Sequence, residues 1–161
     1  MVENTPGAGA TLAALQEVVE EMHATGPGVK ARKFNEALIA DYRATGGTRT
    51  GEIPPKAIVL LTMTGAKSGS TRTVPVGIEE IDGRLIVVAS QSGLPKHPQW
   101  YYNVVANPIV TAEWQGEEFR ALAVVLEGAE RDEIFGKLNE TFHSFQAMTT
   151  RRFPIIELRR I

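Results

Sequence analysis

Hydrophobic residues in the N-terminal part of the chain recur at the three- and four-residue spacing of amphipathic helices. One set follows Thr11, a residue type that caps helices well, and continues to about Ala24, before Gly26-Pro27-Gly28. A second set spans residues 29–44 and precedes Gly46-Gly47, which favours a helix end. The pattern predicts two helices. Their apolar faces either pack against the rest of the protein or form a lid over a core or cofactor.

From residue 57 onward, short apolar runs alternate with turn signals about every ten residues. Asp82-Gly83 is a strong hairpin signal, Gly116 marks a second hairpin, and Asn107-Pro108 stops a short helix. Without any β-α-β alternation, these features predict the α+β class, a small antiparallel β-barrel with helical additions. The predicted strands cover residues 57–63, 73–80, 85–89, 109–114, 118–126 and 154–158, and further helices cover residues 99–106 and 127–141.

The composition is that of a globular domain of 161 residues, with 43% hydrophobic and 22% charged residues. The net charge of -2 argues against a general nucleic-acid binder. The absence of cysteine excludes disulfides, thiolate metal sites and cysteine nucleophiles. No run approaches the ~18 apolar residues of a membrane span, and residues 1–10, expected to be frayed, lack signal-peptide features. The expected location is cytoplasmic, and peripheral membrane association stays open.

The stretch Gly65–Arg72 stands between two predicted strands and combines glycines, hydroxyl residues and two cations. Glycines at positions 65 and 69 permit a tight turn whose backbone amides can point at one place. With the charges of Lys67 and Arg72, the turn offers a phosphate-like anion backbone, side-chain and Coulombic partners. The alternative is a solvated hairpin loop. It is not a Walker loop, because its second glycine is not followed by Lys and Ser or Thr.

A second loop, Ser90–Lys96, is similar in kind, since it combines hydroxyls, a glycine and a lysine. Two cationic loops on either side of a β-pair suggest one elongated anionic ligand that is held at both. Trp100-Tyr101-Tyr102 could stack a flat ligand. The three histidines are isolated in sequence, so no metal site is expected, and no G-x-S-x-G elbow supports serine hydrolysis.

Several motifs together resemble one family. They are Gly65-x-Lys67-Ser68-Gly69-x-x-Arg72, Val74-Pro75-Val76, Val88-Ala89-Ser90, and Gly93-x-Pro95-Lys96-His97-Pro98-x-Trp100-Tyr101-x-Asn103-x-x-Ala106-Asn107-Pro108. In this order, over about residues 30–161, they resemble the deazaflavin-dependent (coenzyme F420) nitroreductases of actinobacteria. The resemblance implies a split β-barrel related to FMN-binding, pyridoxamine-phosphate-oxidase-like barrels. Residues 1–28 would be an N-terminal extension, and residues 29–161 the deazaflavin-binding domain.

The resemblance implies an F420-dependent oxidoreductase in which reduced deazaflavin passes a hydride to an electron-poor acceptor. Candidate acceptors are quinones, enones or unsaturated lactones, and nitroaromatics. The cofactor tail carries a phosphodiester and glutamyl carboxylates, which Lys67 and Arg72 match in charge. The implied cofactor contacts are Lys67, Ser68, Gly69, Arg72, Val74, Pro75, Val76, Ala89, Ser90, Gln91, Lys96, Trp100 and Asn103. The implied acceptor contacts are Tyr42, Phe142 and Phe145, and the candidate proton donors are Ser90 and His143.

Two features depart from the family pattern. Many members carry a lysine where Gln91 stands, so one phosphate partner is either missing or replaced by Lys96. Several members have tyrosines where Phe142, His143 and Phe145 stand, so the acceptor preference is open. The alternatives are an FMN-dependent oxidoreductase and a non-catalytic split-barrel module that binds flavin or haem. The expected partner is a small-molecule hydride acceptor, with no nucleic acid and no integral membrane segment, in a monomer or homodimer.

Overall fold

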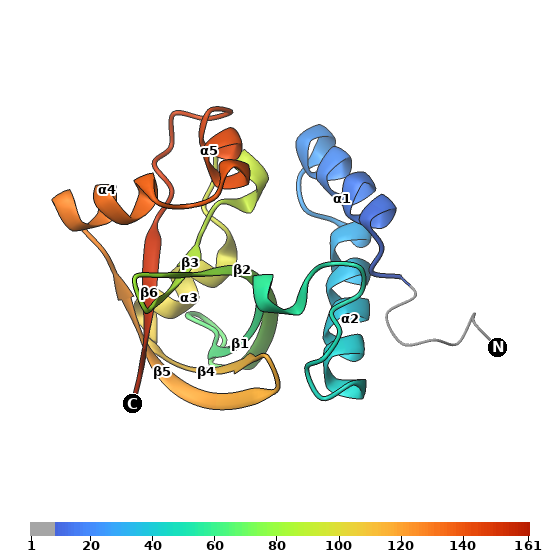
Figure 1. Cartoon of the computed structure of the whole chain (residues 1–161). Helices are drawn as coiled ribbons and strands as arrows, with labels where there is room; N and C mark the ends of the chain where they lie inside the picture. Colours follow the sequence, from blue (N-terminus) through green and yellow to red (C-terminus); the bar gives the residue numbers. More distant parts are fainter. Residues whose placement is uncertain (1–8) are drawn as a thin grey trace.

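The computed structural model describes residues 9–161, in which two N-terminal helices stand beside a six-stranded barrel (Figure 1). The helices are α1 Leu12–Thr25, α2 Val29–Ala44, α3 Gln99–Ala106, α4 Gly128–Gly136 and α5 Glu140–Gln146, with single-turn helices η2 Pro55–Ala57 and η3 Gln91–Gly93. The strands are β1 Ile58–Thr64, β2 Thr71–Ile81, β3 Arg84–Val88, β4 Ile109–Trp114, β5 Glu117–Val125 and β6 Ile155–Arg160. None of the helices in the described range is long and apolar enough to cross a bilayer.

The strands close an antiparallel barrel in the order β1-β2-β3-β6-β5-β4, which confirms the predicted α+β barrel. The long strand β2 is shared between two partners. Its first part, Thr71–Gly77, pairs with β1, whereas β3 pairs only with Ile78–Ile81. Asp82 and Gly83 make the tight turn into β3, with φ of 52° and 77°, as the hairpin signal predicted.

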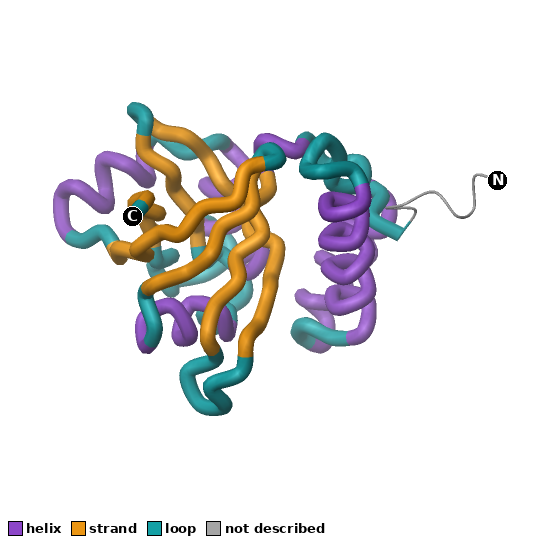
Figure 2. Tube along the Cα trace, turned by 90° about the horizontal axis from the view of Figure 1, so that it is seen from below, coloured by secondary structure: helices purple, strands orange, loops and turns teal. Residues whose placement is uncertain are grey.

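Three hydrophobic clusters hold these elements together. Inward-facing strand residues such as Leu61 and Val87 fill the barrel, because alternate side chains of a strand point to the same face. Helices α1 and α2 pack on each other around Leu38 and contact the barrel at Leu60. A third cluster, which includes Ile134, lies where α4 meets β3 and β6. Figure 2 shows the helical pair beside the barrel from a second direction.

The helix predicted over residues 127–141 is wrong in its extent, because α4 and α5 are separate helices. Asn139 begins α5, since its Oδ1 accepts a hydrogen bond from the Thr141 amide at 2.9 Å. The amide of Asn139 itself donates to the Glu79 carboxylate at 3.0 Å. These polar contacts favour a new helix start over continuation. Across the two helices and the link between them, Ile134 and Leu138 are buried, and Phe135 and Phe142 are partly buried.

The fraying expected for residues 1–10 is wrong at its end. Ala10 is fully buried, and its carbonyl oxygen accepts a hydrogen bond from the Glu52 amide at 2.9 Å. Gly51 has a φ of 61°, and a Cβ atom there would lie 2.1 Å from the same carbonyl oxygen, so this close approach requires glycine. Residues 1–8 lie outside the described residues. The domain boundary between residues 28 and 29 stays a prediction.

Candidate active site

An elongated cleft of about 530 Å³ lies between the N-terminal helices and the barrel. Apolar residues of α1 and α2 form one wall, including Leu15, Val18, Met22 and Phe34, which the sequence analysis did not assign to a site. Their helical spacing was the available signal, and it fits the lid alternative. Of the predicted contacts, the cleft brings together Val74, Pro75, Val76, Ser90, Gln91, Trp100, Phe142 and Phe145.

The barrel wall of the cleft contains an open strand edge. Over Thr71–Gly77, β2 pairs with β1 on one side, and no strand within residues 9–161 pairs with the other side. Alternate backbone amides and carbonyls of this segment therefore point away from β1 without a strand partner. Pro75, which has no N–H group, is tolerated at such an edge. This edge can hydrogen-bond the polar rim of a planar heterocycle.

The loop after β3 reaches the cleft in an uncommon backbone conformation. Gln91 and Ser92 have φ values of 43° and 52°, and Gly93 follows at 79°. Such strain in non-glycine residues persists where the surroundings enforce it, often at binding sites. A Cβ atom on Gly93 would lie 2.7 Å from the Phe145 carbonyl oxygen, so the loop is packed tightly against the end of α5. This packing presents Ser90 and Gln91 to the cleft.

Arg151, which the sequence analysis did not single out, holds this loop in place. It donates to the carbonyl oxygens of Ala89 and Ser90 at 2.9 and 2.8 Å, and to that of Leu94 at 3.0 and 2.9 Å. A planar guanidinium with five donors can fix several carbonyls at once. Ala89 is fully buried, so its side chain supports the loop from inside. No local motif marks Arg151, because its loop partners lie 54 to 62 residues earlier in the chain.

His97 completes the contact with Arg151. The Arg151 guanidinium lies 2.8 Å from the Nδ1 atom of His97. Burial and the positive charge of Arg151 lower the pKa of His97, so the neutral ring accepts this hydrogen bond. Burial also lowers the pKa of Arg151, which nonetheless stays charged at neutral pH. The loop is therefore held by one cation that faces a neutral imidazole.

The cationic turn at Gly65–Arg72 is connected to the cleft by α3. Asn103 of α3 is buried, and its Oδ1 accepts a hydrogen bond from the Ala66 amide at 3.1 Å. Trp100, which lines the cleft, precedes Asn103 by three residues and therefore neighbours it on the helix surface. One helix therefore connects the turn to the cleft lining, through the hydrogen bond at Asn103 and through Trp100. Asn103 positions the turn, and its direct contact with a cofactor stays a prediction.

The turn keeps its charges available. Lys67 and Arg72 are exposed and form no ion pair with any residue of the described range. Gly69 has a φ of 70°, and the Ser68 hydroxyl accepts from the Ser70 amide at 3.1 Å, which leaves its own proton free to donate. This arrangement is consistent with the anion-site interpretation.

Two further exposed cations lie near the same region. Lys96 belongs to the loop that Arg151 holds, and it is exposed. Arg32 of α2, absent from the sequence-based set, lines a cavity of about 440 Å³ together with Thr73, the residue after Arg72. That cavity shares Asn35 with the main cleft, so it continues the cleft along α2.

Two predicted residues lie away from the cleft lining. Tyr42 is buried, and its hydroxyl oxygen accepts a hydrogen bond from the Gly116 amide at 2.9 Å; its contact with the acceptor stays a prediction. His143 faces Phe135 of α4, with ring centroids 4.6 Å apart. Of the two candidate proton donors, Ser90 is therefore the one that lines the cleft.

Comparisons with known proteins agree with this geometry. The profile of the family described as F420H(2)-dependent quinone reductase matches residues 34–159. The F420H(2)-dependent quinone reductase Rv1261c of Mycobacterium tuberculosis is 30% identical over 141 residues, which cover 83% of this chain and 92% of that protein. The solved F420-H2 dependent reductase FDR-A is 39% identical, with a TM-score of 0.58 over 65% of this chain and 95% of that one. A solved structure described as a domain-swapped dimer is 36% identical, with a TM-score of 0.60 over 73% of this chain and 92% of that one.

The chain belongs to the F420H(2)-dependent quinone reductase family. It is therefore a split-barrel oxidoreductase whose cofactor is reduced coenzyme F420. The resemblance drawn from the sequence motifs is confirmed.

Proposed function

We propose that this protein transfers a hydride from F420H2 to a quinone bound in the cleft between the N-terminal helices and the barrel. The observation that carries the proposal is the open edge of β2, which borders an apolar cleft and begins at a cationic turn. A planar hydride donor with a polar rim and an anionic tail requires this combination. The relatives named as quinone reductases support the acceptor class.

The residues present fit the cofactor in ring and tail. The backbone of Val74–Val76 would meet the rim of the ring, and Trp100 would contribute an aromatic wall. Ser90 and Gln91 would approach from the loop that Arg151 holds. Lys67 and Arg72 would pair with the anionic tail. The cleft volume of about 530 Å³ lies within the usual range for small-molecule sites.

When bound, the deazaflavin supplies the hydride, and the protein supplies orientation and the surrounding electrostatics. Conversion of a quinone to a hydroquinone needs one proton for each hydride. The Ser90 hydroxyl lies in the cleft and is the group we assign to deliver that proton from solvent. The apolar walls of α1 and α2 exclude bulk water from the reacting ring faces.

The acceptor side of the cleft favours a neutral, flat molecule. Phe142 and Phe145 present aromatic faces without hydroxyl groups. Such faces stack a quinone or enone well, but they donate no hydrogen bond to the charge that develops on a carbonyl oxygen or a nitro group, so the favoured acceptors are those whose charge water, Ser90 or His143 can relieve. We expect quinones and enones to outpace bulky nitroimidazoles. At saturating cofactor, Phe142→Tyr or Phe145→Tyr should raise nitro turnover relative to quinone turnover, and an unchanged ratio in both variants would contradict this assignment.

The decisive experiment is titration of the purified protein with F420, FMN and haem, followed by stopped-flow oxidation of bound F420H2 by a quinone. We expect F420 to bind more tightly than FMN, with an affinity that falls as salt rises, and to be oxidised rapidly on mixing with quinone. Copurification of stoichiometric FMN, or equal affinities at low salt, would favour an FMN enzyme. Tight binding without hydride transfer to any acceptor would favour a non-catalytic module.

A further inference from the structure

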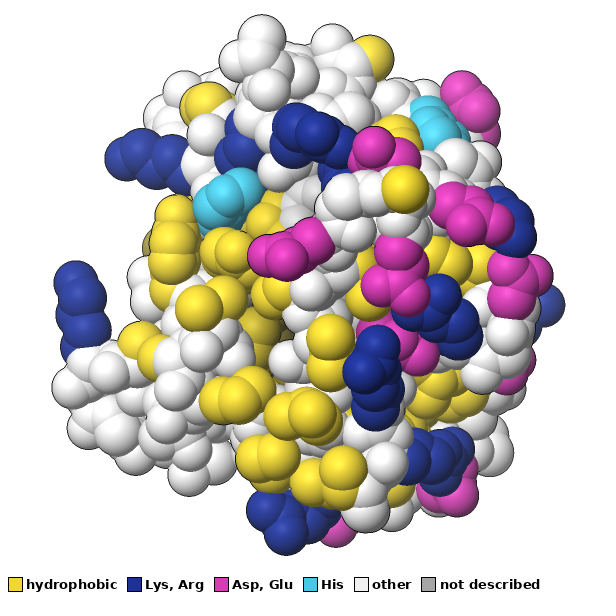
Figure 3. Space-filling model, turned by 90° about the vertical axis from the view of Figure 1, so that its left-hand side faces the viewer, with side chains coloured by type: hydrophobic (Ala, Val, Ile, Leu, Met, Phe, Trp, Pro, Cys, Tyr) yellow, Lys and Arg dark blue, Asp and Glu magenta, His cyan; other side chains and the backbone are white. Residues whose placement is uncertain are grey.

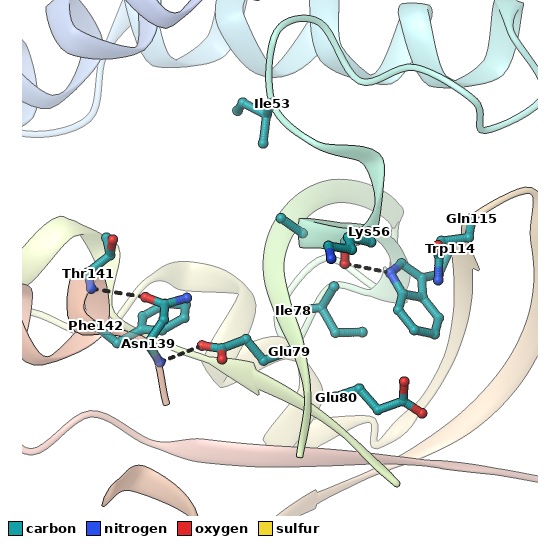
Figure 4. A pocket seen from close by; sticks show the side chains of 11 residues that line it. Ile53, Lys56, Ile78, Glu79, Glu80, Trp114, Gln115, Asn139, Thr141 and Phe142 are labelled. Atoms are coloured by element: carbon teal, nitrogen blue, oxygen red, sulfur yellow. Dashed lines mark hydrogen bonds between the residues drawn. The ribbon is translucent and has the colours of Figure 1, made fainter. Parts of the chain in front are cut away.

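A second cavity, of about 610 Å³, adjoins the cleft at the C-terminal end of β2. It lies between the segment 53–57, β2 and the start of α5, as Figure 4 shows. Ile53, Thr141 and Phe142 line both this cavity and the cleft, so the two spaces are neighbours along β2. None of the site residues predicted from the sequence lies in it except Phe142. We refer to it as the side cavity.

Phe142 stands at the boundary between the cleft and the side cavity. Its ring lies against Gly77, where an added Cβ atom would be 3.3 Å from the ring Cζ atom. A glycine in the middle of a strand is unfavourable by itself, and here it gives the ring room to lie on the backbone. If a planar acceptor stacks on this ring in the cleft, the side cavity is therefore the free space beside it.

Apolar and polar side chains both line the side cavity. The apolar ones are Ile53, Ala57, Ile78, Trp114 and Phe142, and the polar ones include Lys56, Glu80 and Gln115. The indole N–H of Trp114 donates to the Lys56 carbonyl oxygen at 3.0 Å, which fixes the ring. The protein thus satisfies the indole group itself and leaves its apolar surface for a ligand.

Charge is distributed unevenly along β2. The cations Lys67 and Arg72 stand at its N-terminal end, and Glu79 and Glu80 lie in its C-terminal part. Arg72 and Glu80 are eight strand residues apart, which corresponds to about 27 Å. Lys56 also lines the side cavity, so its three charged side chains leave one net negative charge there, and an anionic cofactor tail is drawn to the first end instead. We therefore expect the cofactor tail to lie at the N-terminal end of β2, so that the side cavity at the C-terminal part is available to the acceptor.

We propose that the side cavity binds an apolar side chain of the acceptor, while the acceptor ring lies in the cleft beside Phe142. The ligand class is a neutral quinone with an alkyl or prenyl substituent, and Glu79 and Glu80 disfavour acidic substituents. This inference rests on the proposed function, because it places the second part of the same acceptor.

The kinetic test compares a quinone that carries a decyl chain with the same quinone without it, at saturating F420H2. Ala57→Phe fills the side cavity, and Ala44→Phe, at an exposed position at the end of α2, is the matched control. Ala57→Phe should raise the KM ratio of the decyl quinone to the plain quinone about tenfold, since displacing two buried methylenes corresponds to this factor. The control should leave the ratio unchanged. An equal effect of Ala57→Phe on both quinones, or no effect, would overturn the proposal.

A charge test uses a sulfonated quinone and Glu80→Lys, with Glu133→Lys as the control, because Glu133 is exposed on α4 and neither it nor its chain neighbours line the side cavity. Glu80→Lys should lower the KM for the sulfonated quinone by about threefold relative to the neutral one. Equal responses of the two variants would show that net charge, and not the side cavity, sets this preference.

A binding test keeps the inference separate from catalysis. In cofactor-free protein that carries Trp100→Phe, Trp114 is the only tryptophan. The decyl quinone should quench its fluorescence saturably, and adding Ala57→Phe should weaken this binding about tenfold. Saturable quenching that Ala57→Phe does not change would show that the decyl substituent binds outside the side cavity. If quenching is lost as expected but no quinone oxidises F420H2, the proposed function fails and the binding site stands.

Discussion

The cations on the two sides of the barrel are used in opposite ways. Around β3, β5, β6 and α4, all of them except Arg120 form an ion pair within residues 9–161: Arg84 lies 2.9 Å from Glu157, and Arg160 lies 2.6 Å from Glu117. Figure 3 shows dark blue and magenta side chains next to one another on this face. On the cleft side, Lys67 and Arg72, like Lys96 and Arg32, form no ion pair within residues 9–161.

This difference is the one we expect if the paired cations stabilise the fold and the unpaired cations bind an anionic ligand. A paired arginine is already neutralised by its carboxylate, and the pKa shifts record that pairing: hydrogen bonding to Arg84 lowers the pKa of Glu157. An exposed, unpaired cation contributes little to stability and keeps its full charge for an anion. In a chain with a net charge of -2, the location of unpaired cations is therefore more informative than their number.

The largest expected effect is on cofactor binding by the cationic turn. Lys67→Ala and Arg72→Ala should each raise the F420 dissociation constant about ten- to a hundredfold, because each removes a charged hydrogen bond. The melting temperature should change by less than about 2 °C, since both side chains are exposed. Fluorescence titration checks the dissociation constant, and thermal melts check the melting temperature. Loss of folding with unchanged affinity would assign these residues to structure instead.

The half-buried cation Arg151, behind the cleft, should affect both binding and folding. Arg151→Gln should weaken F420 binding about tenfold and lower the melting temperature, because three loop carbonyls lose their donor. Arg152→Gln is the matched control, since Arg152 is exposed and pairs with Asp132. Equal effects of the two substitutions would contradict the role of Arg151 in holding the loop.

The same substitution gives a pH-dependent signature through His97. The folded state holds this ring neutral, with a pKa below its ordinary value of 6.5. Stability should therefore be complete above that value and fall as the pH decreases towards the lowered pKa. Arg151→Gln removes one cause of the shift, so NMR titration should find a higher His97 pKa and melts should find a shallower pH dependence. An unchanged His97 pKa would count against the coupling.

A paired cation should show the opposite pattern. Arg84→Ala should lower the melting temperature by about 2–4 °C and leave the F420 dissociation constant unchanged. Because the pKa of Glu157 is lowered in the folded state, this stabilisation is present at neutral pH and is lost as the pH falls through that pKa. Wild-type and variant melts should therefore converge in acid. Weaker F420 binding in Arg84→Ala would break the distinction between the two sides.

The smallest expected effects come from the outlying cations. Arg32→Gln and Lys96→Ala should each raise the F420 dissociation constant about two- to threefold, and the effect should vanish at high salt. Both side chains are exposed, so melting temperatures should not move. A loss of F420 affinity as large as that in Lys67→Ala would show that the principal anion site includes α2 or the loop after β3.

Most of the fold could be predicted from local signals. The ranges expected for α2, α3 and β4 agree with the structure, because caps, glycines and prolines fix element ends within a few residues of chain. The exception is the region of α4 and α5, where the break depends on Glu79, sixty residues away in sequence. A helical pattern in the sequence carries no information about such a distant partner.

The motifs of the sequence by themselves determined the family and the cofactor, and they marked two loops as candidate cofactor contacts, since these signals reside in contiguous residues such as Gly65–Arg72. Only the tertiary structure decided which residues share the cleft. It placed Tyr42 in the core and His143 against Phe135, both outside the cleft lining. It also placed Arg151 behind the loop that follows β3. It also left one edge of β2 open, because β3 pairs with only the last part of that strand. These features depend on contacts between distant segments, and local sequence does not specify such contacts.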